Sequence, residues 1–505
     1  MENSKSTMDL KSMAEGLSGI PPLHVVMASP EIAPFAKTGG LGDVLASLPR
    51  ALERLGLRIS LIIPAYRSVL QGGFQLDDAG LGFTVPISNS REAGTLLKTK
   101  MGRDITVYLI RADQYYDREH FYGTHGEDYL DNAERFTFFA RSILGVLKQD
   151  PPAILHAHDW QSALAVAFLK AQPHLYPELS SMKTVFTVHN LGYQGLFSYL
   201  DWHLLNLEGH FFTPRYLEFW GKINFLKGGL VFADKITTVS PAYAEEIKTV
   251  DQGFGLDGVF RERAQDLVGI LNGADYEIWN PETDPFISRT YGPHNLWGKK
   301  SCKSDLQRIF GLHGDPDIPL IGMVSRLTSQ KGFDLLERAM DDLLSRGTQF
   351  VLLGTGDRRY EQIFAEMPER YPGKAGVKID FDEAMAHKVI AGSDLLLMPS
   401  RYEPSGLTQI YSLRYGTIPI VRATGGLKDT IKEFDSKTGE GNGFVFGSYE
   451  VPAFLQVLDR ALDLLRQQKE WSKLMGNAMA ADFSWARSAR SYADLYQKLA
   501  GQSST

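Results

Sequence analysis

A lysine followed by a glycine-rich turn stands near the start of the chain, in Lys37–Val44 (KTGGLGDV). Glycines let a backbone approach a ligand closely, and the helix expected after them offers free N–H groups and a positive dipole end. Lys37, Gly39 and Gly40 are therefore candidates for binding a phosphate. The alternative is an ordinary strand-to-helix turn with Asp43 as its cap, which the residues alone slightly favour.

Two further cations, Arg326 and Lys331, lie in the segment Ser325–Gly332 (SRLTSQKG). A guanidinium provides a planar fork of donors and an ammonium provides a point charge, so the pair suits a diphosphate. The competing interpretation is that both are solvated surface charges, which is the commoner fate of such residues. Gly354, in the turn Gly354–Asp357 (GTGD), adds a weak signal of the same kind.

Two segments rich in imidazole and amide groups could bind a sugar. In His156–Trp160 (HAHDW), His158 follows another histidine by two positions, a spacing that places both on one face of a strand. No compact third or fourth ligand is evident, so no metal site is expected. His189–Gly195 (HNLGYQG), with Asn190, offers the hydrogen-bonding groups that carbohydrate recognition needs. Structural histidines and an ordinary polar loop are the alternatives.

A carboxylate lies between two prolines in Pro399–Thr408 (PSRYEPSGLT). Glu403 could accept hydrogen bonds from sugar hydroxyls, or it could merely cap the next helix. At the helix start that follows, Gly406, Leu407 and Thr408 offer backbone N–H groups to a phosphate. Cations, glycines and polar groups thus recur at strand ends in both halves of the chain. That pattern suits a diphosphate-linked sugar bound between two domains.

Short apolar, β-branched runs alternate with longer segments of helical period, which predicts βαβ units and parallel sheets. The expected strands are His24–Ala28, Ile59–Pro64, Ile154–His156, Thr184–Val188, Lys235–Val239, Leu320–Val324, Phe350–Leu353, Lys378–Asp380, Leu395–Met398 and Ile418–Val421. Each half is therefore expected to form a doubly wound α/β domain, with ligands bound outside the carboxyl ends of the strands. The last segment, Ser484–Leu499, has the spacing of an amphipathic helix.

The composition of the 505-residue chain is that of a globular protein, 43% hydrophobic and 22% charged. A net charge of -7 gives no sign of a nucleic-acid binder. Cys302 is the only cysteine, which excludes an internal disulfide and fits a reducing, cytoplasmic compartment. The sequence contains no run of about 18 apolar residues, so no membrane span is predicted.

The order and spacing of these motifs closely resemble the bacterial glycogen synthase and plant starch synthase family. The likeness begins at about Leu23 and also includes Ser240–Ala244 (SPAYA), Leu271–Asp275 (LNGAD) and Asp482–Trp485 (DFSW). The resemblance implies the GT-B fold, in which two Rossmann-like domains face a deep cleft and a last helix crosses back to the first domain. The expected division is a flexible extension over residues 1–21, domains over 22–270 and 271–483, and the crossing helix over 484–505.

Members of this family transfer glucose from ADP-glucose to the non-reducing end of an α-1,4-glucan, retain the anomeric configuration and need no metal ion or other cofactor. The resemblance therefore implies a hexosyltransferase whose partners are ADP-glucose, ADP and a glycogen or starch acceptor, with neither nucleic acid nor membrane. By the same resemblance, Arg326 and Lys331 are expected to hold the distal phosphate. Glu403 and His158 are expected beside the glucosyl ring.

The other positions carried over by the resemblance divide between the two substrates. Those expected at the nucleotide and its phosphates are Lys37, Gly39, Gly40, Gly354, Gly406, Leu407, Thr408 and Phe381, whose ring would stack on adenine. Those expected at the sugar or the acceptor are Asp43, Tyr116, Asp131 and Asn190.

Two positions depart from the family pattern. Ser405 replaces the cysteine of the usual Glu-Pro-Cys-Gly, which removes a soft nucleophile and should change donor affinity only modestly. Phe381 stands where some relatives have tyrosine. Two competing functions are a GT-B transferase for a small acceptor, such as a sucrose-forming enzyme, and an inactive glucan-binding protein. The presence of Arg326, Lys331 and Glu403 argues against inactivity.

Overall fold

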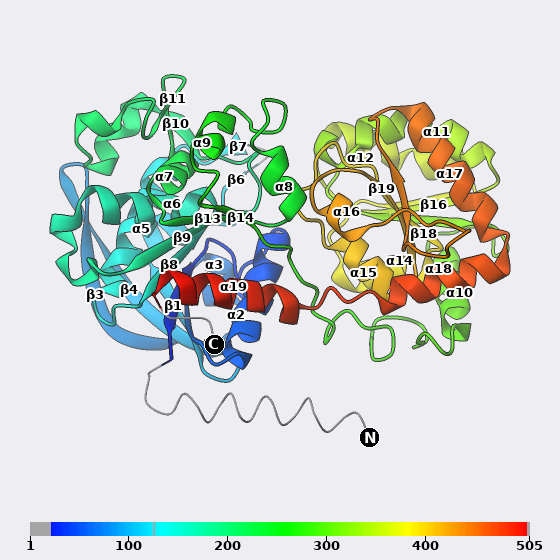
Figure 1. The fold of residues 1–505 in the computed structure, drawn as a ribbon, viewed down its shortest axis with the longest axis horizontal. Coiled ribbons are helices and arrows are strands. Elements are labelled where there is room, and N and C mark those ends of the chain that lie inside the picture. Colours follow the sequence, from blue (N-terminus) through cyan, green and yellow to red (C-terminus); the bar gives the residue numbers. More distant parts are fainter. Residues whose placement is uncertain (1–21, 125–126, 502–505) are drawn as a thin grey trace.

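The computed structural model describes residues 22–124 and 127–501, which form two α/β domains side by side (Figure 1). The extension predicted over residues 1–21 lies outside the described residues, as do residues 502–505 of the last predicted segment. Each domain has its own apolar core. One core gathers residues from Val25 to Ile270 and part of the last helix, and the other gathers residues from Ala274 to Met479. The predicted fold class is therefore confirmed.

A nine-stranded sheet forms the centre of the first domain, in the order β14-β13-β9-β8-β1-β2-β5-β4-β3. Its strands are β1 (His24–Ala28), β2 (Arg58–Pro64), β3 (Asp77–Ile87), β4 (Ser90–Met101), β5 (Ile105–Arg111), β8 (Ile154–His158), β9 (Lys183–Val188), β13 (Lys235–Thr238) and β14 (Leu267–Gly269). The strands from β14 to β5 pair in parallel, and β4 and β3 add an antiparallel edge. The central parallel strands are nearly all buried, as expected for a sheet covered on both faces.

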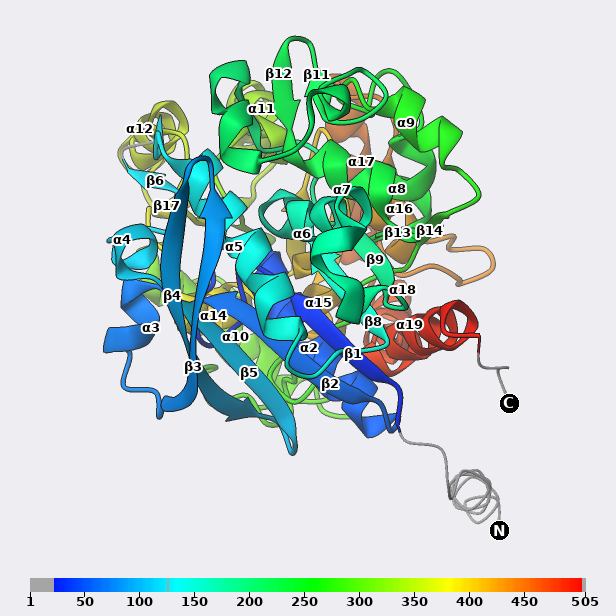
Figure 2. The ribbon, with the colours of Figure 1, turned by 90° about the vertical axis from the view of Figure 1, so that its left-hand side faces the viewer.

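Helices pack around this sheet (Figure 2). They are α2 (Gly40–Arg54), α3 (Arg67–Gln71), α4 (Asp113–Tyr116), α5 (Asn132–Leu147), α6 (Asp159–Ala171), α7 (Phe225–Phe232), α8 (Pro241–Glu246) and α9 (Asp257–Glu262), with the 3-10 segments η1 (Pro173–Leu175), η2 (Pro177–Leu179), η3 (Tyr199–Leu205) and η4 (Gly209–Phe211). Two small antiparallel sheets lie outside the main sheet. One pairs β6 (Gly123–Thr124) with β7 (Glu127–Asp128), and the other has the order β10 (Leu196–Ser198), β12 (Lys222–Asn224), β11 (Glu218–Phe219).

The second domain contains a six-stranded sheet in the order β17-β16-β15-β18-β19-β20, with every pair parallel. Its strands are β15 (Leu320–Val324), β16 (Gln349–Leu353), β17 (Ala375–Lys378), β18 (Leu395–Met398), β19 (Ile418–Arg422) and β20 (Phe444–Phe446). Its helical segments are α10 (Trp297–Ile309), η5 (Ser329–Lys331), α11 (Phe333–Ser345), α12 (Arg358–Ala365), α13 (Met367–Arg370), α14 (Glu383–Gly392), α15 (Thr408–Arg414), α16 (Gly425–Thr430), α17 (Val451–Leu465) and α18 (Gln468–Ala480). The strand predicted at Lys378–Asp380 was misplaced, because β17 ends at Lys378.

The chain crosses between the domains twice, and the two crossings lie side by side. The backbone N–H of Ala274 donates to the carbonyl of Phe483 at 2.7 Å, and Ala274 forms a parallel bridge with Ser484. The last helix, α19 (Trp485–Leu499), then packs on α2 beneath the first domain (Figure 1). Its Trp485, Ala489, Tyr492 and Tyr496 are buried in the first core, so the predicted crossing helix is confirmed.

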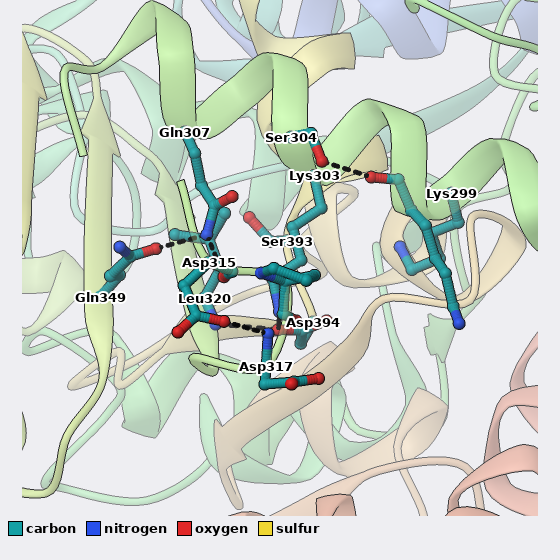
Figure 3. Close-up of polar contacts among 12 residues, drawn as sticks. Lys299, Lys303, Ser304, Gln307, Asp315, Asp317, Leu320, Gln349, Ser393 and Asp394 are labelled. Carbon is teal, nitrogen blue, oxygen red and sulfur yellow. Dashed lines mark hydrogen bonds and ion pairs between the residues drawn. The ribbon is translucent and has the colours of Figure 1, made fainter. Parts of the chain in front are cut away.

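A polar cluster on α10 is bonded to three strands of the second-domain sheet (Figure 3). The Lys303 ammonium lies 2.7 Å from the Asp394 carboxylate, which also accepts the backbone N–H of Leu320 at 2.8 Å. Gln307 donates to the side chain of Gln349 at 2.8 Å. These contacts tie α10 to the first residues of β15 and β16 and to the residue before β18, so they fix the amino ends of these strands, opposite the carboxyl ends from which the cleft loops emerge. No helix within residues 22–124 and 127–501 is both long and apolar enough to cross a membrane.

Candidate active site

A cavity of about 710 Å³ lies between the two domains. Its walls include the loops that follow β1, β8 and β9 in the first domain and β15, β16, β17 and β18 in the second. These loops follow the carboxyl ends of parallel strands, where open α/β sheets bind ligands. The volume is within the range of cavities that hold small-molecule substrates.

Most of the predicted site residues line this cleft. They are Lys37, Gly39, Gly40, Asp43 and Asn190 in the first domain and Arg326, Lys331, Gly354, Phe381, Glu403, Gly406, Leu407 and Thr408 in the second. The folding of two separate domains therefore brings residues from both halves of the chain to one cavity. His158, Tyr116 and Asp131 are not among the lining residues.

Lys37 is held by two carboxylates, one from each domain. Its ammonium lies 2.7 Å from Asp43 and 3.5 Å from Glu383 across the cleft. Burial opposes the charged form, but the two carboxylates outweigh it and raise the pKa of Lys37. Burial also raises the pKa of Asp43, against the effect of Lys37. The two carboxylates thus hold the positive charge of Lys37 in a defined position, and an incoming anion would compete with them for this charge.

The turn after Lys37 is fixed by Glu31, which no sequence motif singled out. The Glu31 carboxylate accepts the backbone N–H and the hydroxyl of Thr38, each at 2.6 Å, and the hydroxyl of Tyr122 at 2.8 Å. Glu31 and Tyr122 both border the cavity. These bonds hold the glycine turn against the cleft, at the N-terminus of α2, so the predicted phosphate-binding geometry depends on a buried carboxylate.

Lys331 and Glu403 form an ion pair on the second-domain wall. The Lys331 Nζ lies 2.6 Å from Oε2 of Glu403, and Ser400 donates to the same oxygen at 3.1 Å. Glu403 is only 4% exposed, yet it borders the cavity. Because the pair is largely desolvated, removing either partner would leave the other charge without compensation.

Arg326 reaches toward a tyrosine of the opposite domain. Its Nη1 donates to the Tyr193 hydroxyl at 3.4 Å, and its guanidinium carbon lies 5.9 Å from the centre of the Tyr193 ring. Arg326 and Lys331 both belong to the turn after β15. Two positive charges therefore enter the cleft from one turn, as a diphosphate would require.

The loop after Glu403 leads directly into α15. Gly406 has a φ of 66°, and a Cβ atom there would collide with the side chain of Gln409, so glycine is needed at this position. Leu407 and Thr408 follow at the start of the helix, where N–H groups lack intrahelical partners. This helix start borders the cavity and can face an anion.

The histidines form a buried chain behind the first-domain wall. The rings of His156 and His158 lie 4.0 Å apart, and Nδ1 of His158 is 3.0 Å from Nε2 of His189. Burial lowers the pKa of both His156 and His158 well below the usual value, and it lowers that of His189 to about 3. The three imidazoles are therefore neutral at pH 7. Tyr496 of α19 closes the chain through a 2.7 Å contact with Nδ1 of His156.

His158, predicted beside the sugar, does not itself line the cavity. Its side chain is wholly buried, and its carbonyl accepts the hydroxyl of Ser162 at 2.8 Å within α6. His189, which contacts His158, lines the cavity instead. The reason is that β8 turns both of its histidines toward the core, so only the next loop along the sheet presents an imidazole to the cleft.

Asp159, the residue after His158, holds a loop of the cleft wall in place. It lines the cavity, has a left-handed φ of 56° and accepts the backbone N–H of His189 at 2.7 Å. Burial raises the pKa of Asp159 to about 7, and hydrogen bonds from the backbone of His189 and Asn190 only partly offset this effect. Asp159 therefore orders the loop that begins at His189.

Two other residues predicted at the sugar or the acceptor, Tyr116 and Asp131, do not line the cavity. Tyr116 is completely buried, and its hydroxyl donates to the carbonyl of Arg135 at 3.2 Å. Asp131 precedes α5, forms an ion pair with Arg118 and does not line the cavity. The nearby aromatic residue that does border the cleft is Tyr122. Both residues thus support the cleft wall from behind.

An aromatic stack that the sequence did not reveal borders the cleft beside α14 and α15. Trp279 lies between the rings of His387 and Tyr411, at centroid distances of 3.7 Å and 4.1 Å. The buried carboxylate of Asp284 fixes His387 through a 2.7 Å contact. The residues come from segments distant in the chain, so no local motif could have signalled their meeting.

Comparisons with known proteins match both domains that border the cavity. The starch synthase catalytic domain family matches residues 24–262, and the glycosyl transferases group 1 family matches residues 309–474. The glycogen synthase of Koribacter versatilis is 45% identical, covering 94% of this chain and 98% of the relative. That of Syntrophotalea carbinolica is 44% identical over 94% of this chain and 99% of its own. The chain belongs to the glycogen and starch synthase family.

Solved structures agree with membership of the glycogen and starch synthase family. The catalytic domain of starch synthase IV from Arabidopsis thaliana, bound to ADP and acarbose, superposes with a TM-score of 0.88 at 32% identity, covering 95% of this chain and all of that one. Sucrose-phosphate synthase from Thermosynechococcus elongatus matches at a TM-score of 0.60 and 15% identity, which shows a shared fold alone. As a family member the chain is a hexosyltransferase with the GT-B fold.

Proposed function

We propose that the enzyme transfers glucose from ADP-glucose to the non-reducing end of an α-1,4-glucan, with retention of configuration and release of ADP. The observation that carries this proposal is that Arg326, Lys331 and Glu403 on one wall and Lys37 on the other border one cavity. The starch synthase IV relative was solved with ADP and acarbose, which supports a nucleotide and an oligosaccharide as ligands of this cleft.

The positive residues have a clear task in such a reaction. Cleavage of the bond between glucose and diphosphate places a developing negative charge on the leaving phosphate. Fixed cations at that position lower the barrier because they stabilise the transition state more than the ground state. Arg326 and Lys331 hold the distal phosphate in this proposal, and Lys37 approaches from the other domain when the cleft closes.

Glu403 binds the glucosyl hydroxyls in the proposal, next to the ammonium that holds the phosphate. A covalent route to retention would need a separate carboxylate on the opposite face of the sugar. Three carboxylates of the first-domain wall are already engaged: Glu31 by Thr38, Asp43 by Lys37, and Asp159 by the backbone of His189. These three engaged carboxylates are poor candidates for a nucleophile, and Asp128, the other described first-domain carboxylate at the cavity, is exposed to solvent, so the proposal is departure and attack on the same face of the sugar.

Adenine recognition falls to Phe381 in this proposal. Its side chain is 68% exposed at the edge of the cleft, and a stacked base would cover it. We also propose that the reaction needs no metal ion, since three cationic side chains serve the diphosphate. A cytoplasmic location completes the proposal.

The test is incorporation of labelled glucose into glycogen by the purified enzyme, with ADP-glucose and UDP-glucose in parallel and EDTA present. Strong incorporation from ADP-glucose is the expected result. Preference for UDP-glucose would overturn the assignment of the base, and loss of activity with EDTA would overturn metal independence. Transfer to free glucose but not to glycogen would replace the polymer acceptor with a small one.

A further inference from the structure

The small sheet β10-β12-β11 and the segment η3 carry an unusual number of exposed apolar side chains. Its exposed members are Leu196, Tyr199, Leu200 and Trp220, and the last of these is 85% exposed. This sheet is an addition to the nine-stranded sheet and adds nothing to its order. Clustered apolar exposure of this kind marks surfaces that bind something.

Two aromatic residues at this surface have backbone conformations that disfavour them. Trp220 has a φ of 53° and Phe254 has a φ of 49°, in the left-handed region that bulky side chains avoid. The Trp220 turn is held by a bond from the N–H of Gly221 to the Glu218 carboxylate at 2.7 Å. Residues held in this region persist where the surrounding structure fixes them, and they cluster at functional sites.

The two strained residues meet at one corner. A Cβ atom on Gly255, the residue after Phe254, would lie 2.8 Å from the Phe219 ring and 3.6 Å from Nε1 of Trp220. The glycine therefore allows the loop of Phe254 to lie against the hairpin that carries Trp220. Both side chains remain exposed to solvent.

This corner is continuous with the active-site cleft. The Phe254 ring packs edge-on against Tyr402 at 5.2 Å, and Tyr402 directly precedes Glu403. Gln194, which lines the cavity, donates to the carbonyl of Phe254 at 3.1 Å. On the same side, Leu196 borders the cavity and begins β10. An apolar path thus leads from the cleft past Phe254 to Trp220.

We infer that the rim surface, defined as Leu196, Tyr199, Trp220 and Phe254, binds the part of an α-glucan chain that extends beyond the reacting end. The inference rests on the proposed function. The apolar C–H faces of pyranose rings fit aromatic rings, and the polar edge of an indole can also reach a hydroxyl. A neutral polymer suits a surface whose contacts are aromatic and aliphatic.

The rim surface explains how one cleft can serve a polymer. Only the terminal sugar has to enter the cavity, and the rest of the chain must leave it along some surface. Contacts outside the cleft raise the effective concentration of chain ends without changing the chemistry. An acceptor too short to extend from the cavity to Trp220 would gain nothing from this surface.

The test compares Trp220→Ala and Trp220→Phe with Trp297→Ala, an exposed tryptophan on α10 in the other domain. Retardation in native gels containing glycogen, without any donor, reports polymer binding alone. We expect Trp220→Ala to weaken this binding about fivefold and to raise the KM for glycogen by the same factor. The KM for ADP-glucose and that for maltotriose should stay within about twofold, since the reacting end is untouched.

Trp220→Phe should keep most of the glycogen binding, because an aromatic face remains, and Trp297→Ala should match the wild type. Unchanged retardation of Trp220→Ala would overturn the inference, as would an equal rise in KM for glycogen and maltotriose. If the wild type binds glycogen through Trp220 but transfers no glucose to it, the proposed function fails while the rim surface stands.

Discussion

The two walls of the cleft differ in charge. The second-domain wall carries Arg326 and the ion pair of Lys331 with Glu403, all charged groups placed for a charged ligand. The first-domain wall presents a neutral imidazole in His189, with His158 buried behind it, because burial lowers the pKa of each. Its Asp159 has a pKa raised to about 7 by burial.

The difference matches the two substrates. A diphosphate is recognised through charge, whereas a glucan offers only hydroxyls and C–H groups, for which neutral hydrogen-bonding groups suffice. Lys37 is the one cation among the described first-domain residues that line the cavity, and it is bound to Asp43 and to Glu383 of the opposite domain. The charge of Lys37 therefore faces the second-domain wall as well as its own.

The largest loss of activity is expected from substitutions that remove the charged residues of the second-domain wall. Glu403→Ala and Lys331→Ala should each lower kcat by at least about a thousandfold, because each removes a contact with the reacting sugar or its leaving group and leaves its partner unpaired. Initial rates of glucose transfer from ADP-glucose measure this.

Lys374→Ala, which removes an exposed lysine elsewhere in the same domain, provides the matched control and should retain wild-type rates. Near wild-type turnover in either Glu403→Ala or Lys331→Ala would remove these residues from the mechanism.

A smaller loss is expected when the shared cation is removed. Lys37→Ala should reduce kcat about a hundredfold, corresponding to the loss of one charge from the transition state. Glu383→Gln loosens the same cross-cleft contact but keeps the cation, so its kcat should change less than about fivefold. Equal losses in the two variants would mean that the contact between domains matters and the charge on the phosphate does not.

The raised pKa of Asp159 in the first-domain wall should make the free energy of unfolding depend on pH. Asp159 has a pKa of about 7 in the folded state, above its ordinary value of 3.8. Between pH 3.8 and 7 the folded state therefore holds a proton on Asp159 that the unfolded state lacks. The free energy of unfolding should therefore fall as pH rises toward 7, on the order of 2 kcal/mol between about pH 5.5 and 7.

Asp159→Asn keeps an acceptor for the His189 N–H and removes the titration. Urea unfolding of both proteins at several pH values measures the difference. A parallel pH dependence in wild type and Asp159→Asn would show that Asp159 is ionised throughout, and the contrast between the walls would then be wrong.

The smallest effect is expected from Ser405→Cys, which restores the usual family residue. Ser405 is 5% exposed and its hydroxyl lies 3.4 Å from the carbonyl of Gly406, so the change swaps one small buried group for another. We expect the KM for ADP-glucose to change less than about threefold. A tenfold gain in kcat would show that a thiol takes part in the chemistry.

The parallel core of both domains could be predicted because each central strand is a short apolar run between helical segments. The strands at His24–Ala28, Leu320–Val324 and Leu395–Met398 have the bounds expected from sequence. The antiparallel edge of β3 and β4 could not be predicted in this way. Half of each strand faces solvent, so polar residues interrupt the apolar signal.

The site was predictable where a residue follows a strand and enters the cleft directly, as Lys37, Arg326 and Glu403 do. Two of the predicted residues that do not line the cavity share a physical cause. His158 and Tyr116 point into the core, and which way a residue faces depends on packing that local sequence does not reveal. Glu31 escaped notice because its importance comes from contacts with Thr38 and Tyr122, and Tyr122 is far along the chain.

The paired crossings at Ala274 and Phe483 have a mechanical consequence. A single linker would let the domains rotate about several axes. Two adjacent crossings joined by a backbone hydrogen bond restrict the relative rotation of the domains to fewer directions. Every closure then brings the same charges to the same place. An enzyme that adds one sugar after another to a growing chain can therefore return to the same relative orientation of its two domains after each addition.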